Sequence, residues 1–95
     1  MHIITKTRLV EFWTDHPDAE GPLKEWHRIV SKTNFADFNA LSATFRSADY
    51  VAPYTVFNIG GNKYRLIVKM EYRYCTAYIR AVLTHTQYDR NKWKE

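Results

Sequence analysis

The sequence is poor in cysteine, glycine and proline, and it has no long apolar run. Its one cysteine, Cys75, excludes a disulfide within the chain and is typical of a reducing compartment. Three glycines and three prolines among 95 residues exclude a collagenous or low-complexity chain. No segment approaches the ~20 apolar residues of a membrane span, and residues 1–6 lack the apolar core of a signal peptide. We therefore expect a cytoplasmic protein with no membrane segment.

The residues that are present are typical of one folded domain. A chain of 95 residues is roughly two-thirds of a usual domain length, so we expect residues 1–95 to form a single domain. Hydrophobic residues make up 45% of the chain and aromatic residues 16%, which is enough to build a core without covalent links.

Positive charge is concentrated in the second half of the chain. The formal net charge is +4. Residues 1–47 carry six basic and six acidic side chains, whereas residues 48–95 carry eight basic and four acidic ones. A basic half on a small protein favours a polyanionic partner such as nucleic acid, with a merely solvated basic surface as the alternative.

The first half of the chain has the periodicity of amphipathic helices. Apolar residues recur there at i, i+3 and i+4 in three segments, which predicts three helices that cover a sheet. His16-Pro17 ends the first helix, and Pro22 fits the first turn of the second. The three apolar sets are Leu9, Phe12 and Trp13; Leu23, Trp26 and Val30; and Phe35, Phe38, Leu41 and Phe45.

From Tyr54 onward the period changes to two, which predicts strands. We expect strands over residues 54–59 and 64–71 with a tight connection at Gly60-Gly61-Asn62, a third strand over 75–83, and an edge strand over 2–5. One face of the sheet should pack on the helices, and the other should carry the cations. The apolar face is Tyr64, Leu66, Val68, Met70, Ala77, Ile79, Ala81 and Leu83; the opposite face is Lys63, Arg65, Ile67, Lys69, Glu71, Thr76, Tyr78, Arg80, Val82 and Thr84.

The pairing of the last two strands decides which cations meet. A tight turn that sets Met70 against Cys75 places Arg65 directly opposite Arg80. Two guanidiniums at that spacing would suit the oxygens of a phosphate group. In the alternative, the register is shifted by two residues and the arginines are only solvated.

The end of the last predicted strand carries a helix-start signal. Thr84-His85-Thr86-Gln87 matches a capping box and predicts a final helix from Thr86 to about Trp93. His85 then lies in the first turn of that helix and shares a face with Tyr88. Because a helix N-terminus disfavours the imidazolium, we expect His85 to be neutral near pH 7 and available as a general base.

These residue types match the needs of RNA cleavage. Attack by a 2′-hydroxyl requires a base, an acid for the leaving 5′-oxygen and cations for the charge on the phosphorane. His85, Tyr88, Arg65 and Arg80 supply these groups. The other histidines are scattered and have no ligand partners at metal-binding spacing, so we expect no metal and no cofactor, and Cys75 is interpreted as a small core residue.

Four stretches together resemble one family. Residues 45–51, 56–66, 78–80 and 84–90, the last reading Thr-His-Thr-Gln-Tyr-Asp-Arg, resemble the HigB-type toxins of bacterial toxin–antitoxin modules, which are similar to the RelE superfamily. The resemblance implies an α+β fold in which helices pack on a small, largely antiparallel sheet. It also implies cleavage of mRNA, typically in the ribosomal A site, and a cognate HigA antitoxin, a helix-turn-helix protein that neutralises the toxin and represses the shared operon.

The resemblance also implies roles for single residues. Arg65 matches an arginine that contacts the scissile phosphate, His85 a position often held by arginine or histidine, and Tyr88 a tyrosine that stacks on or works beside the cleaved nucleotide. Where RelE carries a lysine pair, this chain has Asn58, so Lys63, Lys69 or Arg80 would compensate. This leaves the identity of the general acid open. The residues expected to bind RNA are Lys63, Lys69, Asn58 and Arg90.

The sequence thus predicts a metal-independent endoribonuclease that inhibits translation by cutting mRNA, with mRNA, the ribosome and HigA as partners. A non-catalytic RNA- or ribosome-binding module and a ribosome-independent endoribonuclease are the alternatives.

Overall fold

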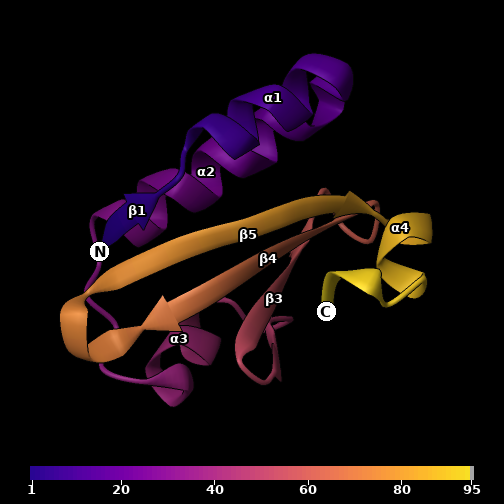
Figure 1. Cartoon of the computed structure of the whole chain (residues 1–95). Coiled ribbons are helices and arrows are strands. Elements are labelled where there is room, and N and C mark those ends of the chain that lie inside the picture. The colour runs from indigo at the N-terminus through magenta and orange to yellow at the C-terminus, as the bar shows by residue number, and fades with distance from the viewer. Residues whose placement is uncertain (95) are drawn as a thin grey trace.

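The computed structural model describes residues 1–94. Five strands form one sheet in the order β1-β5-β4-β3-β2 (Figure 1). β1 is parallel to β5 and all other pairs are antiparallel, so the predicted α+β class with a largely antiparallel sheet is confirmed. In chain order the elements are β1 (His2–Ile4), α1 (Thr7–Asp15), a 3-10 turn (Pro17–Ala19), α2 (Glu20–Ser31), α3 (Phe38–Thr44), β2 (Asp49–Val51), β3 (Tyr54–Ile59), β4 (Tyr64–Glu71), a 3-10 turn (Tyr72–Tyr74), β5 (Thr76–Thr84), α4 (His85–Asp89) and a 3-10 turn (Lys92–Lys94).

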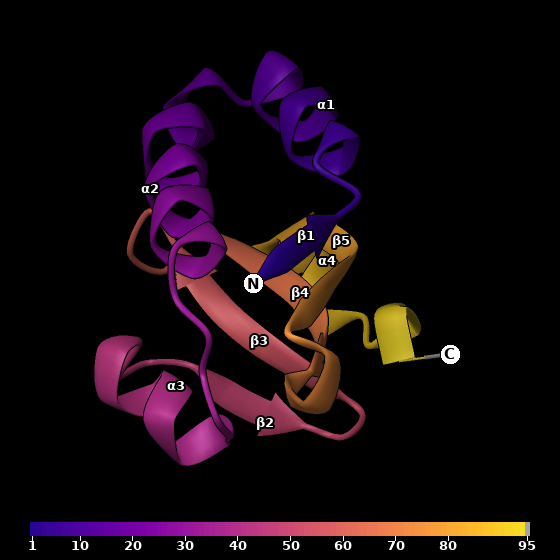
Figure 2. The same ribbon diagram turned by 90° about the vertical axis from the view of Figure 1, so that its left-hand side faces the viewer.

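The helices of the first half cover one face of the sheet, as the periodicity predicts. Figure 2 shows α1 and α2 together over one side of the sheet, and α3 beside β2 and β3. Leu9, Trp26 and Leu41 each contribute a buried side chain from one of these helices, and they pack in one cluster with Phe57 and Leu66 of the sheet. Each such side chain contributes about 1.5–3 kcal/mol to folding when fully buried. Within the described residues, no helix is long and apolar enough to cross a membrane.

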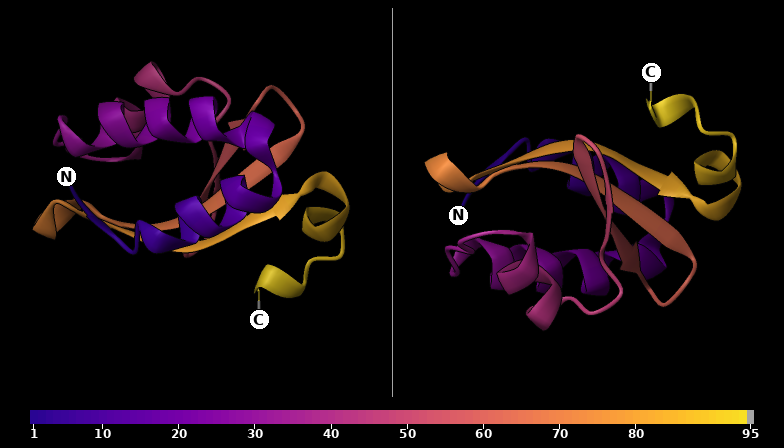
Figure 3. Two further views of the ribbon diagram at one scale, coloured as in Figure 1. Left: turned by 90° about the horizontal axis from the view of Figure 1, so that it is seen from above. Right: turned by 90° about the horizontal axis from the view of Figure 1, so that it is seen from below.

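The alternation predicted a cationic surface on the opposite face of the sheet. That face also carries an apolar cluster. Val56 and Ile67 are buried there beneath Trp93, with Ala81 and Leu83 packed against them. Figure 3 shows the C-terminal segment on the side of the sheet away from α1 and α2. A second, smaller apolar cluster therefore attaches the C-terminal segment to this face.

The predicted pairing of Arg65 with Arg80 is wrong. The turn over Tyr72–Tyr74 continues through Cys75 in a left-handed conformation (φ 49°), so Met70 pairs with Ala77 rather than with Cys75. This is the register shifted by two residues that the sequence left open. A β-bulge between Ile67 and Val68 shifts the register once more, and Arg65 lies opposite Leu83. Cys75 accordingly lies in the turn, half-buried against the main core, rather than in a strand.

The bulge also changes which face each residue of β5 occupies. Ile79 pairs with Val68 and Ala81 with Ile67, so Arg80 is the extra residue on the longer strand. After it, Val82 packs on the main core, whereas Ala81 and Leu83 pack on the second cluster. The predicted faces of these three residues are therefore reversed, because one inserted residue inverts the alternation beyond it.

The final helix is shorter than predicted. The capping box is present, but α4 ends at Asp89 rather than near Trp93. Asn91 then adopts a positive φ of 61°, a conformation that asparagine tolerates better than most residues, and the chain turns there before Lys92–Lys94. The turn comes just before Trp93, whose indole is buried against the sheet. A continuing α-helix would not place Trp93 there.

One polar contact joins the β3–β4 hairpin to the helical layer. Tyr64, which is buried, donates its hydroxyl hydrogen bond to Asp18 Oδ1 at 2.6 Å, and Lys63 Nζ lies 2.8 Å from Asp18 Oδ2. These two hydrogen bonds, first that from Lys63, hold the pKa of Asp18 below its ordinary value of 3.8.

We expect Asp18→Asn to lower the melting temperature at neutral pH, because the hairpin loses its charged partner. Since the pKa of Asp18 is lowered in the folded state, its contribution is complete above about pH 4 and is lost as the pH falls through the folded value. Thermal unfolding should show a constant difference from wild type between about pH 5 and pH 7 that shrinks below about pH 4. Asp15→Asn is the matched control. A difference that persists unchanged at strongly acidic pH would contradict this assignment.

Candidate active site

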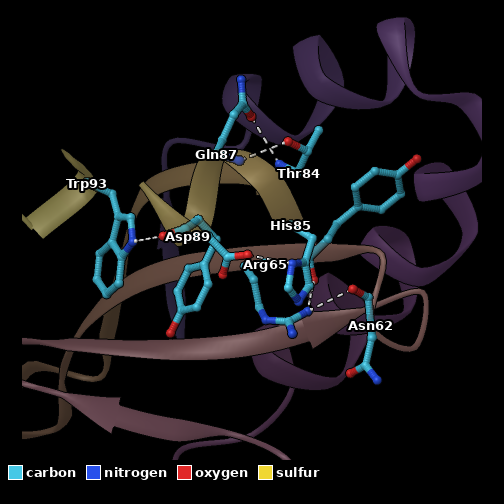
Figure 4. Close-up of polar contacts among 9 residues, drawn as sticks. Asn62, Arg65, Thr84, His85, Gln87, Asp89 and Trp93 are labelled. Carbon is cyan, nitrogen blue, oxygen red and sulfur yellow. Dashed lines mark hydrogen bonds and ion pairs between the residues drawn. The ribbon is translucent and has the colours of Figure 1, made fainter. Parts of the chain in front are cut away.

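The capping box at the end of β5 fixes the position of His85. The Thr84 hydroxyl accepts a hydrogen bond from the Gln87 backbone N–H at 3.2 Å, and the Gln87 side-chain oxygen accepts one from the Thr84 N–H at 3.0 Å (Figure 4). Both partners lie at the N-terminus of α4, so two otherwise unpaired backbone donors are satisfied. His85 is therefore the first residue of α4, one residue before the predicted start, and it lies in the first turn as the sequence predicts.

His85 has a carboxylate partner that the sequence reasoning missed. Its Nδ1 lies 3.0 Å from Asp89 Oδ2, one helical turn later, and both side chains are more than half exposed. A carboxylate only accepts hydrogen bonds, so Nδ1 carries the proton in this contact and Nε2 is the nitrogen left to act as a base. The i, i+4 spacing of the two residues was the signal that could have identified this pair.

Arg65 is held at the start of β4 by backbone oxygens. Its Nη1 donates to the carbonyl oxygens of Asn62 at 3.1 Å and Tyr64 at 3.2 Å, and Figure 4 shows the guanidinium directed toward Asn62. Both acceptors are neutral, so they orient the half-buried guanidinium without cancelling its charge. Its Cζ also lies 5.5 Å from the centroid of the Tyr88 ring, a cation–π distance.

Tyr88 is positioned by Trp93, which the sequence reasoning assigned no role. The two rings stack with centroids 5.1 Å apart and planes at 13°, and Trp93 Nε1 donates a 3.0 Å hydrogen bond to the Tyr88 carbonyl. Trp93 is 6% exposed. The buried indole therefore fixes both the backbone and the ring of Tyr88. The structure thus brings Arg65, His85 and Tyr88 to one end of the sheet.

The two lysines expected to bind RNA form ion pairs outside this cluster. Lys63 forms its ion pair with Asp18 on the helical layer. Lys69 lies 3.5 Å from Glu71 and is four residues from Arg65 along β4, which is about 13 Å at the usual rise per residue. In the structure both ammonium groups are thus engaged by carboxylates that do not belong to the cluster of Arg65, His85 and Tyr88.

The remaining predicted residues divide between two places. Asn58 lies directly opposite Arg65 across β3 and β4, and its amide Nδ2 is 3.5 Å from Asn62 Oδ1. Arg80 does not face Arg65; it lines a hollow with Arg90 instead. The structure therefore places Arg65 in the cluster with His85 and Tyr88, and Arg80 with Arg90 at a separate hollow.

The described part of the chain also bears on metal binding. Within residues 1–94, no group of three or more His, Cys, Asp or Glu side chains is close enough to hold a metal ion.

Comparison with known proteins finds relatives along nearly the whole chain. Residues 19–91 match the HigB_toxin family, described as the RelE-like toxic component of a toxin-antitoxin system. The chain is 33% identical over 92 residues to the mRNA interferase toxin HigB of Escherichia coli strain K12 and to the mRNA interferase HigB of Shigella flexneri, covering 94% of this chain and 88% of each relative. It is 25% identical over 93 residues to the mRNA interferase HigB of Escherichia coli O6:H1, covering 95% and 90%.

These similarities confirm the resemblance carried by the sequence motifs. The family match includes Arg65, His85, Tyr88 and Asp89, and the 33% identity extends over almost all of the chain. The chain therefore belongs to the HigB family, the RelE-like toxins of toxin–antitoxin systems.

Proposed function

We propose that this toxin is an endoribonuclease that cleaves mRNA and thereby stops translation. The observation that carries the proposal is the cluster at the start of β4, where Arg65 lies over the Tyr88 ring and His85 pairs with Asp89 within α4. These groups supply a cation, a hydroxyl and an imidazole, which are the chemical types that transfer of a phosphoryl group from RNA requires. The names of the relatives, mRNA interferases, agree with this chemistry.

In the proposed reaction the RNA supplies its own nucleophile. Nε2 of His85 takes the proton of the 2′-hydroxyl, and the 2′-oxygen forms a bond to phosphorus. The bond from phosphorus to the 5′-oxygen breaks, and that oxygen leaves with a proton from the general acid. The guanidinium of Arg65 stabilises the extra negative charge on the phosphorane. This route uses a base, an acid and a cation from the chain, and we propose that it needs no metal ion.

We propose Tyr88 as the general acid. Trp93 stacks on its ring and the Arg65 guanidinium lies over the same ring, so protein groups already cover the surface on which a base would stack. The phenolic hydroxyl is then the part of Tyr88 that contacts the RNA. Asn58, opposite Arg65, is placed to donate a hydrogen bond to the bound strand.

Asp89 acts through His85, and its removal provides a test of positioning. Asp89→Asn should lower the rate constant of cleavage about tenfold, the effect of losing one charge-assisted hydrogen bond, with little change in KM. Asp89→Glu should retain most of the activity because it keeps the carboxylate. Asp49→Asn, an exposed carboxylate of β2, is the matched control. Equal rates for Asp89→Asn and wild type would exclude this role.

The cellular setting of the reaction is also part of the proposal. We infer that the toxin acts in the cytoplasm on mRNA bound to the ribosome, since a domain of this size offers little surface for sequence selection. Membership in a toxin–antitoxin family implies an antitoxin partner. We propose that it is a HigA-type helix-turn-helix protein, and a small helix-turn-helix gene adjacent to this one would support that assignment.

Primer extension on an in vitro translation reaction tests the function. Purified toxin should produce new 5′ ends within the translated mRNA. Arrest without new ends would instead favour a non-catalytic RNA- or ribosome-binding module. The same toxin incubated with naked mRNA separates the remaining alternative, because equal cleavage there indicates a ribosome-independent endoribonuclease.

A further inference from the structure

Several cations of the second half surround a hollow that the proposed reaction does not use. Arg80 of β5, with Arg90 and Lys92 of the C-terminal segment, lines this hollow together with the Gln87 side chain. All four side chains are exposed. The described lining combines these polar side chains with an apolar part formed by Leu83 and Trp93 among others. A concave surface of this composition is suited to an anion attached to an organic group.

Two local irregularities of the backbone bring these cations together. The β-bulge inserts Arg80 as the extra residue of β5, and such bulges redirect side chains next to functional sites. The positive φ of Asn91 turns the chain between Arg90 and Lys92, so that both line the same hollow. A regular strand and a continuous helix would not produce this grouping, since each residue would follow the ordinary alternation or helical spacing.

The hollow adjoins the proposed cleavage cluster but is distinct from it. Trp93 lines the hollow and also stacks on Tyr88, which lies under Arg65. Along β5, Arg80 is three residues from Leu83, the partner of Arg65, which corresponds to about 10 Å. That separation, with Arg65 directed toward the Asn62 carbonyl and Arg80 lining the hollow, places the two guanidiniums at different points of the sheet. It suits a neighbouring phosphate of the same RNA strand.

We propose that the hollow is a second phosphate-binding site, which holds a nucleotide flanking the cleaved bond. Its ligand is a phosphodiester group of single-stranded RNA, bound by Arg80, Arg90 and Lys92. Arginine forks match the paired oxygens of a phosphate, which a lone lysine cannot do as well. This inference rests on the proposed function, because its ligand is the RNA that the toxin is proposed to cleave. It assigns Arg80 to substrate binding rather than to the chemical step.

The test measures binding and cleavage separately. Binding uses a fluorescent RNA oligonucleotide whose 2′-hydroxyls are methylated, so that no 2′-oxygen can attack. Arg80→Ala/Arg90→Ala should raise its Kd about tenfold at low salt and lower the slope of log Kd against log salt by about 0.7, the value for one phosphate contact on a single strand. Lys32→Ala/Arg46→Ala, which removes two exposed cations from the helical half, should leave both quantities near those of wild type.

A second experiment identifies the phosphate that the hollow binds and shows whether the hollow takes part in the chemical step. A methylphosphonate, which removes the negative charge of one linkage, is placed at each linkage in turn. At one linkage beside the cleaved bond it should weaken RNA binding by wild type, whereas it should not change RNA binding by the double variant there. The double variant should need about tenfold more enzyme than wild type to reach its half-maximal rate of mRNA cleavage, whereas Arg65→Ala should lose cleavage at every enzyme concentration.

The outcomes distinguish this site from the proposed function. Unchanged binding and salt slope in the double variant would overturn the phosphate site, as would a failure of wild type to bind the oligonucleotide at low salt. A loss of cleavage at saturation as large as that of Arg65→Ala would place Arg80 in the chemical step and also overturn it. If wild type binds as expected but cuts no mRNA, the proposed function fails while the phosphate site stands.

Discussion

His85→Ala should lower the rate of mRNA cleavage by about 10²- to 10⁴-fold without unfolding the protein, the usual effect of removing a general base. The side chain is 53% exposed, so its loss leaves no cavity in the core. The capping box uses Thr84 and Gln87, not the imidazole, and alanine is a good helix former, so α4 should still begin at the same residue.

This prediction is checked by single-turnover cleavage on programmed ribosomes, with circular dichroism to verify the fold. His2→Ala is the matched control, because His2 is an exposed histidine in β1, far along the chain from α4. It should cleave as wild type does. Full activity of His85→Ala, with the fold intact, would remove His85 from the mechanism and leave Arg65 and Tyr88 without a base.

Trp93→Ala should have the second large effect, on stability as well as on activity. The indole is 6% exposed and covers Val56 and Ile67 on the sheet. We expect the free energy of unfolding to fall by about 3 kcal/mol, the lower end of the range for a buried tryptophan, because the side chains around the adjoining hollow have room to relax into the space. Cleavage should fall as well, since Tyr88 loses both its stacking partner and the hydrogen bond to its carbonyl.

Urea unfolding measures the loss of stability, and Trp93→Phe separates its two causes. Phenylalanine keeps an aromatic ring on the second cluster but cannot donate to the Tyr88 carbonyl, so its stability should lie between those of wild type and the alanine variant. If Trp93→Ala were as stable and as active as wild type, the C-terminal segment would not be anchored to the sheet in the way described.

Local patterns in the sequence predicted those features that depend on near neighbours. The buried stripe of α2, with Leu23, Trp26 and Val30, follows directly from helical spacing. The N-terminus of α4 follows from Thr84 and Gln87, whose reciprocal hydrogen bonds involve residues only three apart. Such features need no knowledge of the rest of the fold.

The errors arose where distant parts of the chain decide the outcome. Simple alternation assigned Leu83 to the helical face. The inserted Arg80 exchanges the faces of the residues that follow it, and Leu83 packs instead with Trp93, ten residues further along the chain. Lys63 appeared to belong with the cations of the sheet, but Asp18, 45 residues earlier, attracts it to the helical layer. Neither partner could be identified from local spacing alone.

The chemical nature of the cleaved RNA ends tests the central claim most directly, because attack by the 2′-oxygen determines the products. After cleavage on translating ribosomes, the upstream fragment should end in a 2′,3′-cyclic phosphate and the downstream fragment should begin with a 5′-hydroxyl, and neither should form with His85→Ala. Fragments that carry a 3′-hydroxyl and a 5′-phosphate would show that water or another nucleophile attacks the phosphate, and would contradict the mechanism built on Arg65, His85 and Tyr88.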